Sequence, residues 1–290
     1  MRPSSAPQPP AGEVDDLSGQ PAFTRLTARR HLASGSIDTI EAVAAEVPVA
    51  LVYNGISHVV MMATPQDLAD FALGFSLSEG ILRRPGELAD LEIVWDANGI
   101  EARMTIDKLR FAKLAERRRN LTGRTGCGIC GLDSLEAVLR PLPALTPQPT
   151  PSLDAVRRAL AALPEAQRIN RETHSIHAAA WADREGKLLL LREDVGRHNA
   201  LDKLIGAMAR AEIDPAAGFA LITSRCSVEM VQKAAAIGIP VLVAISAPTA
   251  LARRVAESCG LTLVALARPD SVLVVTHPRR ILGTPAGGMP

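Results

Sequence analysis

Two cysteines lie three residues apart in this 290-residue chain, within the segment Thr122-Gly-Arg-Thr-Gly-Cys127-Gly-Ile-Cys130-Gly-Leu132. Four glycines surround the two thiols, and glycine lets a backbone approach a partner closely and move freely. The chain has four cysteines in all, too few for a disulfide scaffold. A Cys-x-x-Cys pair without such a scaffold is typical of metal binding or of thiol, redox and sulfur chemistry.

The residues before the two cysteines are strongly basic. From Lys108 to Arg124 there are seven Lys or Arg residues against one acid, Glu116, so the local net charge is +6. Cationic neighbours favour the thiolate, which is the reactive form of cysteine. The same field would attract an anionic ligand or an acidic partner surface.

Three interpretations of Cys127 and Cys130 compete. They could be small residues of a turn, or they could bind zinc together with His174 and His177, although these histidines lie beyond a proline-rich segment. Thiol chemistry is favoured, with one cysteine attacking or carrying sulfur and the other resolving or relaying it. A thioredoxin-like disulfide exchanger ranks second, because its motif normally opens a helix after the first strand of a compact domain.

The other two cysteines lie in the second half of the chain. Cys226 follows a predicted strand and could be a second nucleophile, but no partner residue stands near it in the sequence, which favours a buried small residue. Cys259 precedes a helix-ending glycine, and we expect it to pack in the interior.

Polar residues follow each apolar run of the second half. They form the segments Glu193–Asn199, Ser224–Ser227, Ser246–Thr249 and Arg268–Ser271. Open α/β sheets bind ligands at the carboxyl ends of their strands. Arg197, Arg225 and Arg268 are therefore candidates for phosphate or base contacts, with surface ion pairs as the alternative.

Three further charged residues have local interpretations. His198 could orient a base or accept a proton, or it could bond to a nearby carboxylate such as Asp194. Glu229 and Lys233 are four residues apart, a spacing that predicts a surface ion pair on a helix.

The elements that must position these residues can be predicted from periodicity. In the first half, apolar runs at 47–52 and 59–62 flank Asn54-Gly55, a strong hairpin signal. Thr64-Pro65-Gln66-Asp67 then resembles a capped helix start, and Gly80 marks the helix end. A second strand pair is expected near 91–95 and 100–106.

The second half alternates strands and helices. Apolar runs at 187–192, 219–223, 240–245 and 261–266 are separated by segments with helical periodicity. Continuous Val, Ile and Leu strands predict an α/β fold whose sheet is covered on both faces and at least partly parallel.

Prolines divide the chain, with five before residue 22 and five between Pro141 and Pro151. We expect four regions: a flexible tail at 1–37, an N-terminal α+β domain at 38–115, a basic cysteine loop and Pro-rich linker at 116–152, and an α/β ligand-binding domain at 153–284.

Composition excludes several classes of function. A net charge of +1 argues against a general nucleic-acid binder, and eight aromatic residues are too few for base-stacking platforms. No apolar run approaches ~18 residues, and the first 16 residues lack the apolar core of a secretory signal. We expect a cytoplasmic protein that binds neither nucleic acid nor membranes.

Long motifs in order resemble one family. TGRTGCGICG, REDVGRHNALDK (192–203), TSRCSVEMVQKAA (223–235) and THPRRI (276–281) are similar to the formate dehydrogenase accessory sulfurtransferase family, FdhD/NarQ. VYNG (52–55), ATPQDLADFALGF (63–75) and SEGI (78–81) extend the resemblance, which covers roughly residues 38–282.

The resemblance implies a sulfurtransferase. A cysteine desulfurase would load sulfur onto Cys127 as a persulfide, with Cys130 as a relay or resolving thiol, and the sulfur would pass to the bis-molybdopterin guanine dinucleotide cofactor of formate dehydrogenase. The cofactor-binding segment aligns with Leu266, Ala267, Arg268, Pro269, Asp270 and Ser271. The family often has a glycine and a basic residue at the last two of these positions.

The resemblance also implies a cytidine-deaminase-like α/β core after a smaller N-terminal α+β domain. The deaminase zinc signature is missing, because His177 is followed by alanines and the cysteine pair comes earlier. No metal is expected to be held by the protein itself, and two guanine halves in the cofactor would suit a twofold dimer. The alternative function is a zinc-stabilised scaffold that binds the cofactor or apoenzyme without sulfur chemistry.

Overall fold

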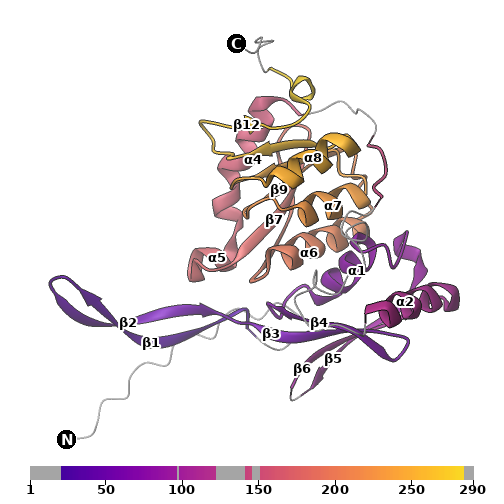
Figure 1. Ribbon diagram of the computed structural model, residues 1–290. Helices are drawn as coiled ribbons and strands as arrows, with labels where there is room; N and C mark the ends of the chain where they lie inside the picture. The colour runs from indigo at the N-terminus through magenta and orange to yellow at the C-terminus, as the bar shows by residue number, and fades with distance from the viewer. Residues whose placement is uncertain (1–20, 97, 122–140, 146–150, 284–290) are drawn as a thin grey trace, which may run out of the picture.

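The structure, a computed structural model, describes residues 21–96, 98–121, 141–145 and 151–283. It consists of a two-stranded ribbon, a four-stranded sheet and a six-stranded sheet with helices (Figure 1). The elements in chain order are β1 (Phe23–Leu32), β2 (Gly35–Ala44), β3 (Val47–Tyr53), β4 (Ile56–Ala63), α1 (Leu68–Ser78), η1 (Pro85–Glu87), β5 (Leu88–Asp96), β6 (Gly99–Ile106), α2 (Lys108–Leu121), α4 (Leu153–Ala166), α5 (Arg168–Thr173), β7 (His177–Asp183), β8 (Leu188–Asp194), α6 (Arg197–Arg210), β9 (Gly218–Ile222), α7 (Val228–Ala236), β10 (Val241–Ala244), α8 (Ala250–Cys259), β11 (Thr262–Ala265), β12 (Leu273–Val274) and η2 (Pro278–Arg280).

The four-stranded sheet has the strand order β4-β3-β6-β5 and contains both predicted strand pairs. Asn54 and Gly55 connect β3 to β4 with φ values of 46° and 81°. A two-residue type I′ turn requires such left-handed values at both positions, so the hairpin prediction is confirmed. Alternate residues of β3 (Val49, Leu51 and Tyr53) are fully buried in the core that also contains α1.

The start of α1 differs from its prediction. Thr64 was the expected cap, but the N-cap is Asp67, in the left-handed conformation and without a side-chain cap bond. Thr64 Oγ1 instead accepts a hydrogen bond from Val195 N–H at 3.1 Å, and its N–H donates to the Asp194 carboxylate at 3.0 Å. A contact with the second domain therefore replaces the local cap.

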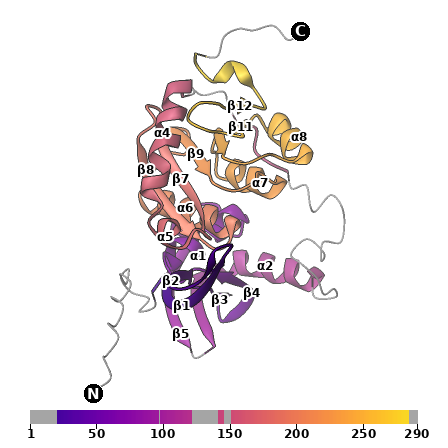
Figure 2. The same ribbon diagram turned by 90° about the vertical axis from the view of Figure 1, so that its left-hand side faces the viewer.

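The six-stranded sheet has the order β12-β11-β10-β9-β7-β8. β9, β10 and β11 are parallel to one another, whereas β7 runs antiparallel to both β8 and β9. α4 covers one face of this sheet, while α7 and α8 lie on the other (Figure 2). The predicted α/β sheet, partly parallel and covered on both faces, is confirmed; its likeness to a cytidine-deaminase core stays a prediction.

Helices α1 and α6 join the two sheets through direct backbone contact. A Cβ atom added at Gly74 would lie 1.7 Å from the carbonyl oxygen of Asp202, and one at Gly206 would lie 1.9 Å from that of Asp70. A side chain at either glycine would therefore force the two helices apart.

The prediction of a flexible tail at residues 1–37 is wrong for its last part, from Phe23 onward. β1 and β2 form an antiparallel ribbon from the pair Phe23–Ala44 to the pair Leu32–Gly35, so the predicted boundary at 38 falls inside β2. Proline cannot donate a backbone hydrogen bond to a neighbouring strand, and none occurs from Ala22 to Val47. Every residue of β1 and β2 therefore has an N–H group for strand pairing.

Among the described residues, no helix is both long and apolar enough to cross a lipid bilayer.

Candidate functional site

The two predicted reactive cysteines, Cys127 and Cys130, lie outside the described residues. The chain before them forms α2, in which Arg110 pairs with Glu87 at 2.9 Å while Lys108 and Lys113 are exposed. The basic stretch predicted from the sequence is thus helical over residues 108–121.

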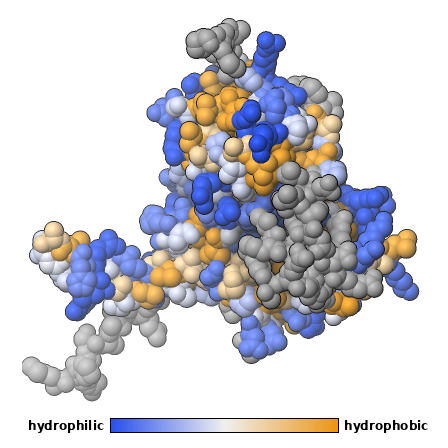
Figure 3. Space-filling model, viewed as in Figure 1, coloured by the Kyte–Doolittle hydropathy of each residue, from blue (hydrophilic) through white to orange (hydrophobic). Residues whose placement is uncertain are grey.

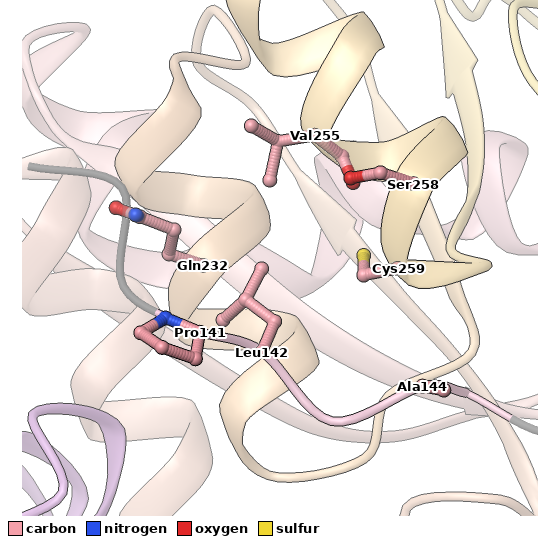
Figure 4. A pocket seen from close by; sticks show the side chains of 7 residues that line it. All are labelled: Pro141, Leu142, Ala144, Gln232, Val255, Ser258 and Cys259. Atoms are coloured by element: carbon pink, nitrogen blue, oxygen red, sulfur yellow. The ribbon is translucent and has the colours of Figure 1, made fainter. Parts of the chain in front are cut away.

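The chain after the cysteine segment contacts the second, α/β domain. Leu145 N–H donates to the carbonyl oxygen of Cys259, at the end of α8, at 2.8 Å. Residues 141–145 run past α7 and α8, where they help to line a cavity of about 310 Å³ (Figure 4). The cavity is lined by Pro141, Leu142, Ala144, Gln232, Val255, Ser258 and Cys259.

The polar segments after β9, β10 and β11 meet at one edge of the six-stranded sheet. Cys226 N–H donates to the carbonyl of Ala247 at 3.2 Å, and Cys226 carbonyl accepts from Thr249 N–H at 3.0 Å. Leu266 N–H donates to the carbonyl of Ser246 at 3.2 Å. These bonds fix the three segments side by side, as predicted for strand carboxyl ends.

The predicted cofactor-binding residues, Leu266 to Ser271, form the outermost of these segments. Leu266 is half exposed and has a φ of 48°, a backbone conformation that leucine rarely adopts. Arg268 and Ser271 exchange backbone hydrogen bonds of 2.7 and 3.2 Å, which close a turn. Ala267 is buried, whereas Arg268, Pro269, Asp270 and Ser271 are exposed.

Three helices begin at this edge. Their N-caps are Gly196 for α6, Ser227 for α7 and Thr249 for α8. Thr249 caps its own helix by accepting from Ala252 N–H at 3.1 Å, whereas the hydroxyl of Ser227 is buried without a hydrogen-bond partner among the described residues. Helix N-termini carry partial positive charge and unpaired N–H groups, which favour anions.

The three arginines proposed as ligand contacts all lie along this edge, but they differ in solvent exposure and in hydrogen bonding. Arg268 Nη1 donates to the carbonyls of Ile245 at 2.5 Å and Ala267 at 2.9 Å, so part of its guanidinium braces the strand ends. Arg225 is exposed and Arg197 is half-buried. The edge is therefore basic.

The loop from Asp194 to Asn199 is held by a buried ion pair. Asp194 accepts from Lys203 Nζ at 2.7 Å, and neither side chain is exposed to solvent. Asp194 also accepts from Gly196 N–H at 2.7 Å and from the Asn199 amide at 3.0 Å. Lys203 donates to the carbonyl of Thr64 at 2.9 Å, so the same network attaches the loop to the first domain.

His198 has a different partner from the one considered in the sequence. Its Nε2 lies 2.9 Å from a carboxylate oxygen of Glu229 on α7. Burial lowers the pKa of His198, the negative charge of Glu229 raises it, and the positive charge of Arg197 lowers it.

The predicted surface pair between Glu229 and Lys233 is wrong. Lys233 is buried and contacts Asp202 at 2.9 Å and Glu79 at 2.8 Å. It also donates to the hydroxyl of Ser78 at 3.0 Å. This cluster joins α1, α6 and α7. The sequence around a lysine in a helix does not indicate that its partner is a buried carboxylate on a distant element.

The two described cysteines are buried, as predicted. Burial raises the pKa of Cys226 to about 12 and also raises that of Cys259. A thiol with a raised pKa is a poor nucleophile at neutral pH. Both therefore act as small interior residues.

The zinc interpretation remains a prediction. Among the described residues, no group of three or more His, Cys, Asp or Glu side chains could hold a metal ion. The proposed zinc ligands include Cys127 and Cys130, which lie outside that part of the chain.

Comparisons with known proteins agree with the resemblance seen in the sequence. The model of the FdhD/NarQ family matches residues 44–282. A relative from Xanthomonas euvesicatoria pv. vesicatoria, named sulfur carrier protein FdhD, is 52% identical over 271 residues, which cover 93% of this chain and 96% of that protein. A relative of the same name from Variovorax paradoxus is 50% identical and covers 94% and 99% of the two chains.

A solved structure shows the same fold. It is described as a formate dehydrogenase accessory protein from Desulfotalea psychrophila. The TM-score is 0.72 at 25% sequence identity, and the match covers 90% of this chain and all of that one.

Proposed function

The chain belongs to the FdhD/NarQ family, and on that premise we propose that it is a sulfur carrier that serves the maturation of formate dehydrogenase. One observation carries the proposal: relatives named sulfur carrier protein FdhD share about half of their residues with it over more than nine-tenths of the chain.

We assign the carrier role to Cys127. Its thiolate would attack the terminal sulfur of a persulfide on a cysteine desulfurase; a new S–S bond forms, the donor's S–S bond breaks, and the donor thiolate leaves. No net oxidation occurs, so no further oxidant is needed. Cys130 would relay or resolve the sulfur, and the protein acts as a sulfurtransferase.

The other thiols are unsuited to this role. Cys226 and Cys259 are buried with raised pKa values, which leaves the cysteine segment to supply the nucleophile. The positive charges of Lys108 and Lys113 lie on the helix that leads to that segment, and cationic neighbours favour a thiolate.

We propose that the client, a molybdenum cofactor with guanine dinucleotide arms, binds at the basic edge of the six-stranded sheet. The observations that support this are three helix N-termini, the arginines 197, 225 and 268, and the buried hydroxyl of Ser227, for which the described part of the chain supplies no hydrogen-bond partner. Phosphate groups suit such donors. The exposed carboxylate of Asp270 would oppose a phosphate, so backbone groups of 266–271 would make the closest contacts there.

The partners follow from this role. They are a cysteine desulfurase as donor and formate dehydrogenase as recipient, and the place of action would be the cytoplasm. Two guanine arms on one cofactor suit a twofold dimer of this chain, which we propose as the assembled state.

Sulfur loading tests the carrier role. After incubation with a cysteine desulfurase and cysteine, the peptide that contains Cys127 should gain the mass of one sulfur atom. The Cys127→Ala variant should gain none, while the matched control Cys226→Ala should load like the parent. An unmodified parent protein, with a competent desulfurase present, would refute the carrier role. Stoichiometric zinc that is lost in a Cys127→Ser/Cys130→Ser variant would favour the zinc-stabilised scaffold instead.

Client binding has its own test. The chain purified from a cell that makes the cofactor should release guanine nucleotide and pterin on denaturation. Replacing Arg225 and Arg268 by alanine should reduce both together by about tenfold or more. Replacing the exposed Arg253 and Arg254 of α8 should not change them, and equal losses in both variants would argue against the strand-end site.

A further inference from the structure

Helix α2 packs against the first domain on one side and is exposed to solvent on the other. Leu114 is buried in the core, and Phe111 packs against that core. Lys108, Leu109 and Lys113 lie on the exposed side, and Leu109 is 76% exposed. Residues four apart are neighbours on a helix, so Leu109 adjoins Lys113. At the right of the molecule, where α2 lies, the surface is mostly hydrophilic with a small hydrophobic area (Figure 3).

The loop before η1 brings further positive charge to this side of α2. Glu87 lies 2.9 Å from Arg110 of α2 and 3.9 Å from Arg84. Its carboxylate also accepts a hydrogen bond from the backbone N–H of Arg83 at 2.8 Å. Arg83 and Arg84 are exposed, with 80% exposure for the Arg84 side chain. One carboxylate therefore holds the loop against the helix while the arginine side chains face solvent.

The exposed residues of the loop and the helix form one basic surface, here called the α2 surface. Its members are Arg83, Arg84, Lys108, Leu109 and Lys113. Within the described part of the chain, no carboxylate forms an ion pair with Arg83, Lys108 or Lys113. Segments 83–87 and 107–116 contain five cations and three acids, which leaves a net charge of +2. An exposed leucine surrounded by charged side chains matches the apolar centre and polar rim of a protein interface.

The α2 surface is close in the chain to the proposed carrier thiol. Cys127 follows Leu121, the last residue of α2, by six residues. Six residues span at most about 22 Å, and the 14 residues of α2 span about 21 Å. A small protein domain is about 30 Å across. A protein that binds the α2 surface can therefore reach Cys127 with its own reactive groups.

We propose that the α2 surface docks the sulfur donor through an acidic face of that donor. Opposite charges steer the association of two proteins and suppress wrong partners. Docking here presupposes the carrier role proposed above and adds the surface that the donor recognises. The client is proposed to bind at the edge of the six-stranded sheet, on the second domain, which leaves the α2 surface of the first domain for the donor.

Loading kinetics test this docking. In the surface variant, Arg83→Glu/Lys113→Glu, the second-order rate constant for loading of Cys127 by a cysteine desulfurase should fall about tenfold or more at low salt. Arg253→Glu/Arg254→Glu makes the same change in net charge at exposed positions of α8 and should load like the parent. Added salt should slow the parent more than the surface variant. Thermal unfolding confirms that both variants are folded.

Alkylation separates docking from the reactivity of the thiol. Iodoacetamide is uncharged and needs no docking, so it should modify Cys127 at the same rate in the parent and in the surface variant. A fall in alkylation equal to the fall in loading would assign the effect to the thiolate and overturn the docking. Unchanged loading of the surface variant, or an equal loss in Arg253→Glu/Arg254→Glu, would also overturn it.

Cross-linking locates the contact. A carbodiimide joins lysine amines directly to carboxylates, and the chain has five lysines. Lys203 and Lys233 are buried, whereas Lys108, Lys113 and Lys187 are exposed. With the desulfurase present, Lys108 or Lys113 should link to its Asp or Glu residues, and Lys187 of the second domain should not. Links at Lys187 alone, or none at all, would contradict the docking. A parent protein that takes up no sulfur would instead refute the carrier role itself.

Discussion

At the scale of single residues, buried charges hold the candidate site in place. Asp194 and Lys203 are fully buried, and their network reaches Thr64 of the first domain. Removing one partner of such a pair leaves an uncompensated charge in a medium of low dielectric constant. The loop that carries Arg197 and His198 to the sheet edge depends on this pair.

We expect Asp194→Asn to lower the free energy of unfolding by about 3–5 kcal/mol, because Lys203 would remain charged and buried. The matched control is Asp38→Asn, which breaks an exposed pair with Arg29 and should cost less than about 1 kcal/mol. Urea denaturation followed by circular dichroism measures both. Similar losses in the two variants would contradict this reading of Asp194.

The His198 imidazole should titrate below the ordinary histidine pKa of 6.5, because burial disfavours its charged form. Glu229 raises this pKa, so Glu229→Gln should lower it further. The unfolded chain then binds the proton more readily than the folded one, and His198 therefore reduces stability as the pH falls below 6.5. NMR titration of the ring protons checks the direction; the exposed Glu165→Gln should leave it unchanged, and a raised pKa in Glu229→Gln would contradict the pairing.

At the scale of elements, the crossing of α1 and α6 sets the relation between the two sheets. Gly74 and Gly206 allow the two backbones to touch, and Lys233 of α7 joins the same junction through Asp202 and Glu79. Close backbone contact leaves little room for adjustment. The position of α6, whose N-terminus lies at the sheet edge proposed to bind the client, therefore depends on the first domain.

Gly74→Ala should destabilise the protein by at least about 3 kcal/mol, because overpacking typically costs about 1–3 kcal/mol and here a Cβ would meet backbone. Gly86→Ala is the matched control, since a Cβ there would meet open space, and it should change stability by less than about 0.5 kcal/mol. Urea unfolding measures both. A neutral Gly74→Ala would show that the helices do not touch as described.

At the scale of the whole molecule, the two sheets should unfold together. They share one hydrophobic core that runs from Val49 and Phe71 through Leu201 to Leu242. The hydrogen bond from Lys203 to the carbonyl of Thr64 and the ion pair between Lys233 and Glu79 cross the same boundary. Such shared contacts make separate unfolding of either part unfavourable.

The two tryptophans report on the two parts separately, because Trp95 lies in β5 and Trp181 in β7. In the single-tryptophan variants Trp95→Phe and Trp181→Phe, we expect the fluorescence midpoint in urea to coincide with the midpoint from circular dichroism of the same variant. Trp181→Phe should lower the midpoint itself, because it removes volume from a fully buried site. Two separate transitions in either variant would refute the single cooperative unit.

Local elements and candidate reactive residues could be predicted from the amino-acid sequence. Asn54-Gly55 specified its turn through left-handed backbone preferences, and apolar periodicity located α6 to α8 with the parallel strands between them. The polar segments after those strands were predicted to meet at one edge of the sheet, because parallel strands end on the same side, and backbone hydrogen bonds join them there. The family followed from long motifs in order, and the family model confirms it.

Contacts between groups far apart in the sequence could not be predicted, because they depend on how the elements pack. β7 was missed because its run of alanines carries no strand signal, although the six-stranded sheet buries it between β9 and β8. Thr64 does not cap α1 but bonds to Val195, His198 contacts Glu229, and Lys233 is buried against Asp202. Each of these partners lies on a different element, far along the chain. Local patterns encode local hydrogen bonds and periodic burial, whereas the pairing of buried charges depends on how the helices cross.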